Sequence, residues 1–232
     1  MAAIELFSGS LYNDASLQSY YRFEADSTDT KGLNTGTDTS MTYGAGKFNN
    51  GAIFNGTTGF CSIGTSKFNH TTMSIVFWLV NKGTDKTADL IARNPDADQW
   101  ANLGIAMVGS YLYLATNAGA VVNKRVMAYS ALTSGDHLAF ILNSDGTAIV
   151  YQNGTVVTPT DALTGFGAWN NNITNTLSFG RNGAYNNYYF DGKLDDLAFF
   201  SKALSADEVK YLYDNTPIPV AASTEQGYSY FM

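Results

Sequence analysis

The sequence predicts an all-β fold, an antiparallel sandwich or barrel with one short C-terminal helix. Turn signals recur about every ten residues and separate many short apolar runs, a spacing typical of sandwiches and barrels. Charged residues make up only 14% of the 232 residues, aromatic residues also reach 14%, and glycine occurs 22 times. This composition favours strands and turns over helical bundles, which need more Glu, Lys and Ala.

The strand candidates follow one another at short intervals. They are the runs 17–25, 51–56, 59–64, 73–81, 103–108, 111–116, 121–129, 137–143, 148–152, 155–157, 177–180 and 193–200. The links between them are too short for crossovers, so neighbouring strands should pair antiparallel. Asn153-Gly154 is the strongest hairpin signal. The run 73–81 is apolar on both faces, so a loop, the C-terminal tail or another chain must cover its outer face.

One helix is expected near the end of the chain, within residues 203–214. Ser205 is a suitable N-cap, and Glu208 follows it at the spacing of a capping box. Leu204 precedes the cap and can pack against Val209 as a hydrophobic staple. These signals predict a helix that begins directly after Ser205.

The chain is expected to have three segments. Pro217 and Pro219 end the helix and force an extended path. We expect an N-terminal arm over 1–11, one sandwich over 12–214, and a C-terminal extension over 215–232 that docks on its own domain or on a neighbour. The apolar residues of the extension and the strand with two apolar faces suggest assembly with other chains.

Charged and metal-ligating side chains are scarce. The net charge is −7 and no basic cluster occurs, which argues against nucleic acid and anionic lipid as partners. The single cysteine, Cys61, is expected to be a small buried residue of a strand. His70 and His137 lie far apart in the sequence, which argues against the usual type of zinc site. No secretory signal and no membrane-spanning run is found.

Four stretches of the chain resemble the laminin-G-like, concanavalin-A-like jelly-roll family. They are YYRFEADSTDTKG (20–32), GKFNNGAIFNGTTGFCSIG (46–64), HLAFILNSDGTAIVYQNGTVV (137–157) and FDGKLDDLAFFSKALSADEVKYLY (190–213). The resemblance covers residues 17–214. It implies a two-sheet antiparallel jelly-roll sandwich in which the last strand returns to pair near the first and a short helix caps the sandwich edge. It also implies a mostly non-catalytic protein that binds glycans or proteins at surfaces.

The carboxylates give little support for enzymatic activity. Glycosidases of this fold need paired carboxylates on one concave strand. Apart from the capping Glu208 and two terminal glutamates, the chain offers only Glu24, with Asp26 and Asp29 beside it. This triplet lies at the first strand instead of in the middle of a sheet. We therefore expect no enzyme, and a glycoside hydrolase is kept only as an alternative.

Calcium is the one cofactor that the sequence suggests, in a structural role. Asp26 and Asp29 lie in the opening loop, and Asp195 and Asp196 lie in the last strand. Carboxylate oxygens suit calcium, and the resemblance implies a calcium between strand ends. If the first and last strands pair, these four residues converge near one sheet end. The alternative is that Asp195 accepts backbone amides while Asp26 and Asp29 are solvated turn formers.

Glycan binding is the common role that the resemblance implies, and several loop residues suit it. Aromatic rings stack on sugars, while Asn, Asp and Arg side chains hydrogen-bond to hydroxyl groups. The alternative is that these aromatic rings close the open ends of the sandwich. The candidate ligand-binding residues are Arg93, Asn94, Asp98, Trp100, Trp169, Asn171, Arg181, Tyr185 and Tyr188.

These observations predict a non-catalytic binding and adhesion module that recognises glycans. The alternative is a structural virion decoration or fibre protein that mainly packs against neighbouring subunits, because low charge and abundant Asn, Thr and Gly resemble virion surface proteins. The expected location is the surface of a virion or other particle, or the extracellular space. The expected partners are a glycan or host surface, together with further copies of the chain or particle neighbours.

Overall fold

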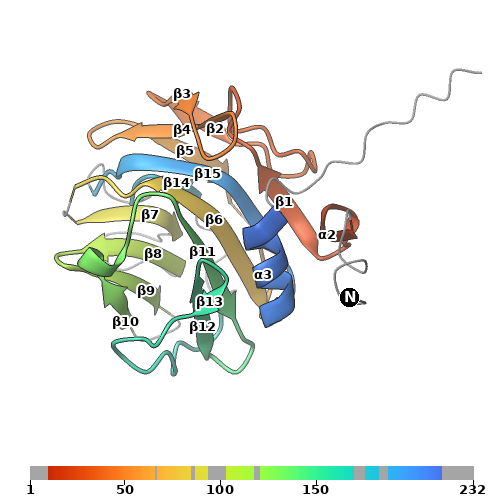
Figure 1. Cartoon of the computed structure of the whole chain (residues 1–232), viewed down its shortest axis with the longest axis vertical. Coiled ribbons are helices and arrows are strands. Elements are labelled where there is room, and N and C mark those ends of the chain that lie inside the picture. Colours follow the sequence, from red (N-terminus) through yellow and green to blue (C-terminus); the bar gives the residue numbers. More distant parts are fainter. Residues whose placement is uncertain are drawn as a thin grey trace, which may run out of the picture.

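The structure is a computed structural model that describes residues 10–65, 67–84, 87–93, 103–117, 121–169, 176–182 and 188–215. Within these residues, antiparallel sheets of eight and seven strands stack into a sandwich (Figure 1). The predicted all-β jelly-roll fold is therefore confirmed. Most of the predicted N-terminal arm and nearly all of the C-terminal extension lie outside the described residues.

The eight-stranded sheet has β15 near its centre. Its strand order is β13-β12-β11-β6-β15-β4-β3, and β1 also pairs with β15. One edge of β15 pairs with β6, while the other edge pairs with β4 and then with β1. The first strand of the chain thus lies against the last, as the resemblance implies. The bounds are β1 Leu17–Tyr21, β3 Thr42–Ala45, β4 Asn50–Asn55, β6 Met73–Asn81, β11 Asp136–Leu142, β12 Ala148–Gln152, β13 Thr155–Val156 and β15 Asp191–Phe200.

The seven-stranded sheet has the order β10-β9-β8-β7-β14-β5-β2. Its bounds are β2 Thr37–Thr39, β5 Phe60–Gly64, β7 Ala88–Arg93, β8 Leu103–Val108, β9 Tyr111–Asn117, β10 Val121–Ala128 and β14 Leu177–Phe179. Three helical segments accompany the sheets in the described ranges. They are α2 Ser10–Asn13, the 3₁₀ turn η1 Tyr129–Ala131 and α3 Ala206–Asn215.

Each of the expected runs overlaps a strand, and three more strands occur within the described residues. The runs 73–81, 103–108 and 148–152 coincide with β6, β8 and β12. The short strands β2 and β3 are polar, and β7 has charged residues within its apolar run, so none shows a clear alternation. Asn153 and Gly154 have φ values of 52° and 73°, as a two-residue hairpin turn of type I′ requires.

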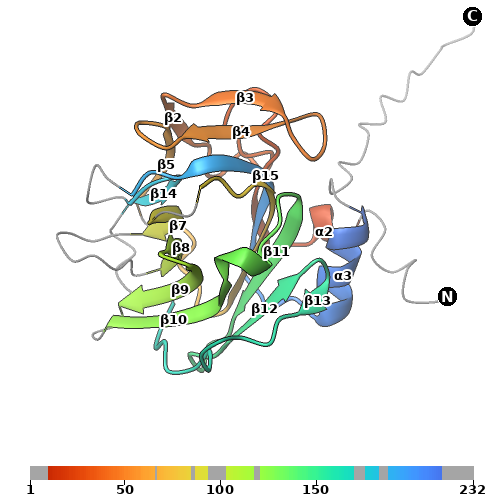
Figure 2. The same cartoon turned by 60° about the vertical axis from the view of Figure 1, so that its left-hand side comes forward.

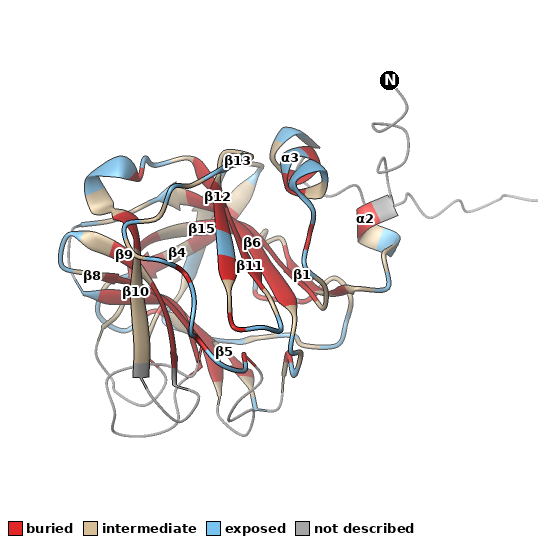
Figure 3. Ribbon diagram, turned by 90° about the horizontal axis from the view of Figure 1, so that it is seen from below, coloured by how far each residue is buried: buried red, intermediate tan, exposed pale blue. Residues whose placement is uncertain are grey.

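A large apolar cluster fills the space between the two sheets. Phe77 stacks on Phe140 with ring centroids 6.1 Å apart, and Phe68 stacks on Phe199 at 4.1 Å. Cys61 of β5 is buried in the same cluster, as predicted. Most strands of both sheets are accordingly buried along much of their length (Figure 3). Both sheets therefore direct alternate residues into one shared core.

A second apolar cluster lies on the outer face of the eight-stranded sheet, beneath α3. Val76, Ala139 and Ile141 of the sheet pack there with Val209 and Leu212 of the helix. Figure 2 shows α3 on the opposite side of β11 from β8, β9 and β10. The predicted helix of the same chain thus covers the outer face of β6, the strand that is apolar on both sides. The helix lies on this face, not at the sandwich edge that the resemblance implies, because its apolar stripe needs an apolar partner.

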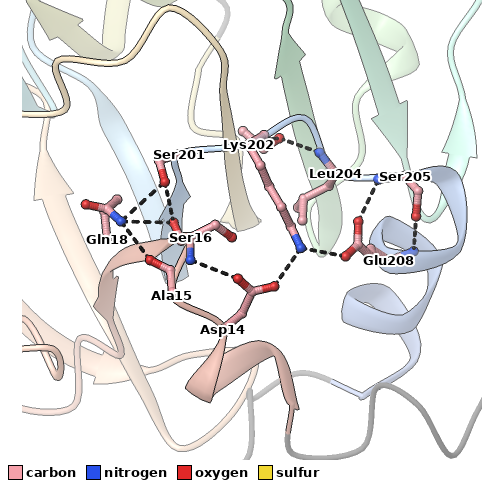
Figure 4. Close-up of polar contacts among 10 residues, drawn as sticks. Asp14, Ala15, Ser16, Gln18, Ser201, Lys202, Leu204, Ser205 and Glu208 are labelled. Carbon is pink, nitrogen blue, oxygen red and sulfur yellow. Dashed lines mark hydrogen bonds and ion pairs between the residues drawn. The ribbon is translucent and has the colours of Figure 1, made fainter.

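The N-terminus of α3 is anchored by the predicted capping box (Figure 4). The Ser205 N–H donates to Glu208 Oε2 at 2.8 Å, and the Glu208 N–H donates to Ser205 Oγ at 3.2 Å. Lys202 Nζ lies 2.8 Å from Glu208 Oε1 and 2.6 Å from Asp14 Oδ2. The ammonium group therefore links the helix to the segment between α2 and β1.

Candidate functional site

The predicted ligand-binding residues divide between two ends of the seven-stranded sheet. Arg93 is the last residue of β7, whereas Arg181 and Tyr188 lie near the other end of that strand, beside Asp89. Trp169 is also within the described chain. The predictions for Asn94, Asp98, Trp100, Asn171 and Tyr185 lie outside the described residues.

Trp169 is part of the core between the sheets. Its side chain is 0% exposed, and its ring centroid lies 4.8 Å from that of Phe166. The indole Nε1–H donates to the carbonyl oxygen of Asn143 at 2.7 Å. Both its polar atom and its ring surface are therefore already used within the protein, which favours the packing alternative for this residue.

The outer face of the seven-stranded sheet has a different character from its core face. Residues that are paired across antiparallel strands share a face, and neighbours along a strand alternate between faces. Leu103, Ile105 and Leu114 point into the core, so their neighbours point outward. We call this outer surface the polar face. Its residues are Ser62, Asp89, Ala92, Gly104, Ala106, Tyr113, Ala115, Asn123, Arg125 and Ser178.

Asp89 is the most deeply buried carboxylate of the polar face. It is 9% exposed, and its side chain is hydrogen-bonded to Asn182, which is 1% exposed. Burial raises the pKa of Asp89 to about 7, although the hydrogen bond from Asn182 acts in the opposite direction. The backbone N–H of Asp89 donates to the carbonyl oxygen of Tyr188 at 2.9 Å. Asp89 is therefore a fixed oxygen acceptor whose charge changes near neutral pH.

Aromatic side chains border Asp89 on one side. The guanidinium carbon of Arg181 lies 3.4 Å from the ring centroid of Phe60, and the Phe60 ring lies 6.5 Å from that of Tyr189. Tyr189 forms an isolated bridge with Asp89. The structure thus brings the predicted residues Arg181 and Tyr188 together beside a carboxylate. Their half-exposed side chains provide both ring surface and hydrogen-bonding groups.

Polar atoms also occur at the other side of the polar face. Arg125 forms a two-point contact with Asp161, with Nη2–Oδ1 at 2.8 Å and Nε–Oδ2 at 3.1 Å. The half-buried ring of Tyr113 lies opposite Arg125 across the β9–β10 pair. Asn123 Oδ1 and Ser178 Oγ are buried without a hydrogen-bond partner among the described residues. The small residues between these groups, Ala92, Gly104, Ala106 and Ala115, are buried.

The sequence predicts only residues at the border of this site, namely Arg181 and Tyr188. Asp89 was not a candidate because it interrupts a short apolar run, and β7 itself was not predicted. Ser178 lies in the predicted run 177–180, but its outward direction depends on pairing with β7. The available signal was compositional: Asp89 is an acid between apolar residues, which is unusual for a buried strand.

The acids predicted to bind calcium mainly accept backbone amides. Asp29 is 1% exposed and accepts N–H bonds from residues 20, 31, 33 and 34 at 2.9, 3.0, 3.1 and 2.9 Å. Asp26 is exposed and accepts the Thr28 N–H at 2.9 Å. Asp26 is thus a solvated turn former, as the alternative to calcium binding expected. Asp29 differs from that alternative because it is buried.

Of the two acids of β15, Asp195 is held by several backbone N–H donors, whereas Asp196 Oδ2 is buried without a partner in the described chain. Asp195 Oδ2 accepts the N–H groups of Lys47 and Phe48 at 2.8 and 3.1 Å, and burial raises its pKa to about 6. Asp196 has a φ of 47° and accepts the Tyr20 hydroxyl, and burial raises its pKa to about 7. Tyr20 also donates its N–H to Asp29, so its side chain separates the two sets of acids. In the described part of the chain, no three His, Cys, Asp or Glu side chains gather in a way that could hold a metal ion, so the donor set does not fit calcium.

Comparison with known structures finds the same fold in several proteins. Domain 4 of AbnA, an extracellular arabinanase from Geobacillus stearothermophilus solved with arabinotriose, has a TM-score of 0.67 and 22% identity over 85% of this chain and 98% of that chain. The binding domain of Paraclostridial Mosquitocidal Protein 1 has a TM-score of 0.66 and 16% identity over 85% of this chain and 52% of that chain. Trypanosoma rangeli sialidase has a TM-score of 0.62 and 13% identity over 86% of this chain and 32% of that chain. The chain thus spans about half of the second protein and about a third of the third.

Two further findings concern the sequence and the helices. No curated protein sequence matches the chain. None of the helices in the described ranges has the length and apolar character needed to cross a membrane. A family profile described as the Concanavalin A-like lectin/glucanases superfamily matches residues 55–210, which is more than half of the chain. The chain therefore belongs to the laminin-G type of the Concanavalin A-like lectin/glucanases superfamily.

Proposed function

We propose that this protein is a non-catalytic glycan-binding module whose ligand lies on the polar face. The observation that carries the proposal is the hydrogen-bonded pair of Asp89 and Asn182 beside the aromatic border of Phe60 and Tyr189. A carboxylate and an amide accept and donate to neighbouring sugar hydroxyl groups. An aromatic ring next to them packs on the C–H face of the same sugar.

The remaining polar face suits a ligand longer than one sugar. The residues between Asp89 and Asn123 are mostly small and buried, namely Ala92, Gly104, Ala106 and Ala115, so a longer ligand that reaches them would lie close to the backbone. Asn123 Oδ1 and Ser178 Oγ offer two further acceptors that lack partners in the described chain. Buried polar groups without partners are costly, so hydroxyl groups that satisfy them would add affinity.

The absence of catalysis in this proposal rests on the carboxylates near the face. Asp161 has both oxygens engaged by Arg125, so among the described residues Asp89 has no second carboxylate to act as its acid or base partner. The alternative triplet around Glu24 is also engaged. Glu24 Oε1 pairs with Arg22 Nη2 at 2.9 Å, and Asp29 is enclosed by backbone amides.

The fold neighbours supply a first probe. Domain 4 of AbnA was solved with arabinotriose, and the second neighbour is the binding domain of a mosquitocidal protein. These identities are below a level that transfers function, so the neighbours only guide the choice of ligand. Arabinotriose and a broad array of neutral oligosaccharides are therefore the starting set.

The test replaces Asp89 with Asn, which keeps its size and removes its charge. We expect Asp89→Asn to weaken binding of the best neutral oligosaccharide at least about tenfold, because a charged acceptor gives the stronger hydrogen bond. Isothermal titration calorimetry measures the affinity, and circular dichroism checks the fold. Asp145→Asn is the matched control, since Asp145 is exposed in the turn between β11 and β12. Equal affinities for Asp89→Asn and the unaltered protein would contradict this site.

Display on a virion, particle or cell surface is part of the same proposal. The competing proposal of a structural decoration or fibre protein began from the strand with two apolar faces. Because α3 covers the outer face of β6, that strand no longer requires a second chain. A glycan-binding module displayed on a surface is therefore the function that the geometry supports best.

A further inference from the structure

Arg93 is a buried cation with few partners. Its side chain is 0% exposed and lies on the core side of β7, opposite Leu103 and Leu177. Nη2 donates to the carbonyl oxygens of Lys67 and Phe68 at 2.5 and 3.3 Å. Nε and Nη1 are buried and have no acceptor in the described part of the chain. Three of the five N–H donors of a guanidinium group are carried by those two nitrogens.

Such an arrangement is costly unless an anion completes it. Burial lowers the pKa of Arg93 to about 10, so the side chain remains cationic at neutral pH. No Asp or Glu of the described ranges forms an ion pair with it. A buried charge normally has a counter-charge, and a buried donor normally has an acceptor. In the described ranges, Arg93 has no counter-charge, and only its Nη2 has hydrogen-bond acceptors.

The turn beneath Arg93 holds the guanidinium in place. Phe68 has a φ of 54°, a rare value for a bulky residue, and its ring stacks on Phe199 in the core. This conformation directs two successive carbonyl oxygens at Arg93 Nη2. His70 follows in the same segment, is half-buried, and has its pKa lowered by burial and by the charge of Arg93. His70 is thus within electrostatic reach of the guanidinium and nearer to solvent.

We propose that Arg93 and the 67–70 turn form a binding site for an oxyanion, namely the carboxylate of an acidic sugar. The carboxylate would accept from Nε and Nη1, and it would enter by local opening of the turn beside the half-buried His70. This inference rests on the proposed function in one respect only, namely that the ligand is a sugar. It concerns the opposite end of β7 from Asp89, so the two sites are tested separately.

The charge distribution supports an anionic ligand at this end. The protein carries a net charge of −7, yet Arg93 itself is a buried cation with only His70 in its described electrostatic surroundings, while Lys67 contacts it through a backbone carbonyl and directs Nζ at the Leu33 carbonyl oxygen. A local positive site in an acidic protein attracts anions selectively to that site. Asp96 and Asp98 follow Arg93 by three and five residues in the sequence, and they are the internal counter-ions to be tested.

The experiment uses the two histidines of the chain as reporters. NMR follows the pH titration of His70 and His137 in the whole protein, with glucuronate, glucose or inorganic phosphate added. Glucuronate should raise the pKa of His70 by about half a unit, because an anion next to Arg93 offsets its positive charge. His137 lies on the outer face of the other sheet, beside Trp78, and should not respond.

Three outcomes overturn the proposal, and none requires a variant. No response of His70 to glucuronate removes the site. An equal response to glucose shows that the carboxylate is not recognised. A response to phosphate as large as that to glucuronate overturns the assignment to an acidic sugar. Loss of neutral glycan binding in Asp89→Asn, with the His70 response intact, separates this site from the polar face.

Variants then assign the response to Arg93. Arg93→Met should abolish the glucuronate response, Arg93→Lys should keep only part of it, and Arg125→Lys is the control on the opposite face of the sheet. Asp96→Asn and Asp98→Asn should leave the pKa of His70 unchanged without ligand. If either raises or lowers it, the chain supplies its own counter-ion and the proposal fails. If Arg93→Met does not fold, the ligand series on the unaltered protein still decides.

Discussion

The outer faces of the two sheets differ although both sheets share one core. On the eight-stranded sheet, Val76, Ala139 and Ile141 form an apolar surface that α3 covers. On the seven-stranded sheet, the corresponding surface carries small and polar residues around Asp89 and Asn123. The first face is completed by a helix of the same chain. The second offers polar atoms without partners, which is the chemistry of a surface that meets a polar ligand.

This difference shows which part of the fold is committed to stability. A face that is apolar must be covered permanently, because its exposure costs about 25 cal/mol for each Å² of apolar surface. A face that is polar can be covered intermittently by a ligand or by water. The sandwich thus uses one outer face to carry its helix, and the other is the face on which we propose that a glycan binds.

The largest effect is expected from placing a charge under α3. Val209 is 0% exposed in the apolar cluster beneath the helix. Val209→Asp should lower the free energy of unfolding by about 4 kcal/mol, because it buries a carboxylate without a partner. Urea denaturation followed by Trp fluorescence measures this change.

The matched variant places the same residue on the polar face. Tyr113→Asp should cost less than about 1.5 kcal/mol, because Tyr113 is half-buried and lies opposite Arg125. If both variants destabilise equally, the contrast between the faces is wrong.

A medium effect is expected from the buried acid Asp196. Its folded pKa of about 7 lies above its value of 3.8 in the unfolded chain, so its contribution to stability is complete below pH 3.8 and is lost as pH rises through 7. Asp196→Asn should therefore raise the melting temperature at pH 8 by about 3 °C and have little effect near pH 4. Asn also tolerates the positive φ of this position.

At acid pH, the dependence of stability on pH is set by His137. Burial lowers the pKa of His137 to about 3, below its usual 6.5, so its contribution is complete above pH 6.5 and is lost as pH falls through 3. Thermal denaturation from pH 4 to pH 8 compares Asp196→Asn with Asp145→Asn, whose side chain is exposed. A uniform shift at all pH values would argue against titration of Asp196.

The smallest effect is expected from removing divalent cations. Asp29 and Asp195 already accept several backbone amides, so a calcium ion would find few free oxygens. EDTA should change the melting temperature by less than about 1 °C, and added calcium should not restore or raise it. A drop of several degrees that calcium reverses would establish the calcium site that the sequence suggested.

The sequence predicts the frame of this fold better than its site. Local signals sufficed for β6, for the Asn153-Gly154 turn and for the capping box of Ser205 and Glu208, because each depends on neighbouring residues. Trp169 shows the limit of such signals, since a tryptophan at the end of a loop can face solvent or the core.

The site depends on register, which local patterns do not set. Asp89 meets Ala106 and Tyr113 only because β7, β8 and β9 pair with a particular alignment. A shift of one residue would turn Asp89 into the core. The family resemblance correctly indicated the two-sheet fold, but the residues on this face emerge only from the pairing of four strands.

The position of β15 also has a consequence for how the chain is made. This strand contacts β1, β4 and β6, yet it is among the last parts of the domain to leave the ribosome. Until then, β1, β4 and β6 lack the strand that joins them, and the outer apolar face of β6 lacks the helix that covers it. Long-range pairing of this kind slows folding and exposes nascent chains to aggregation. Synthesis rate and chaperone supply should therefore govern the yield of this protein more than the equilibrium stability of the finished sandwich.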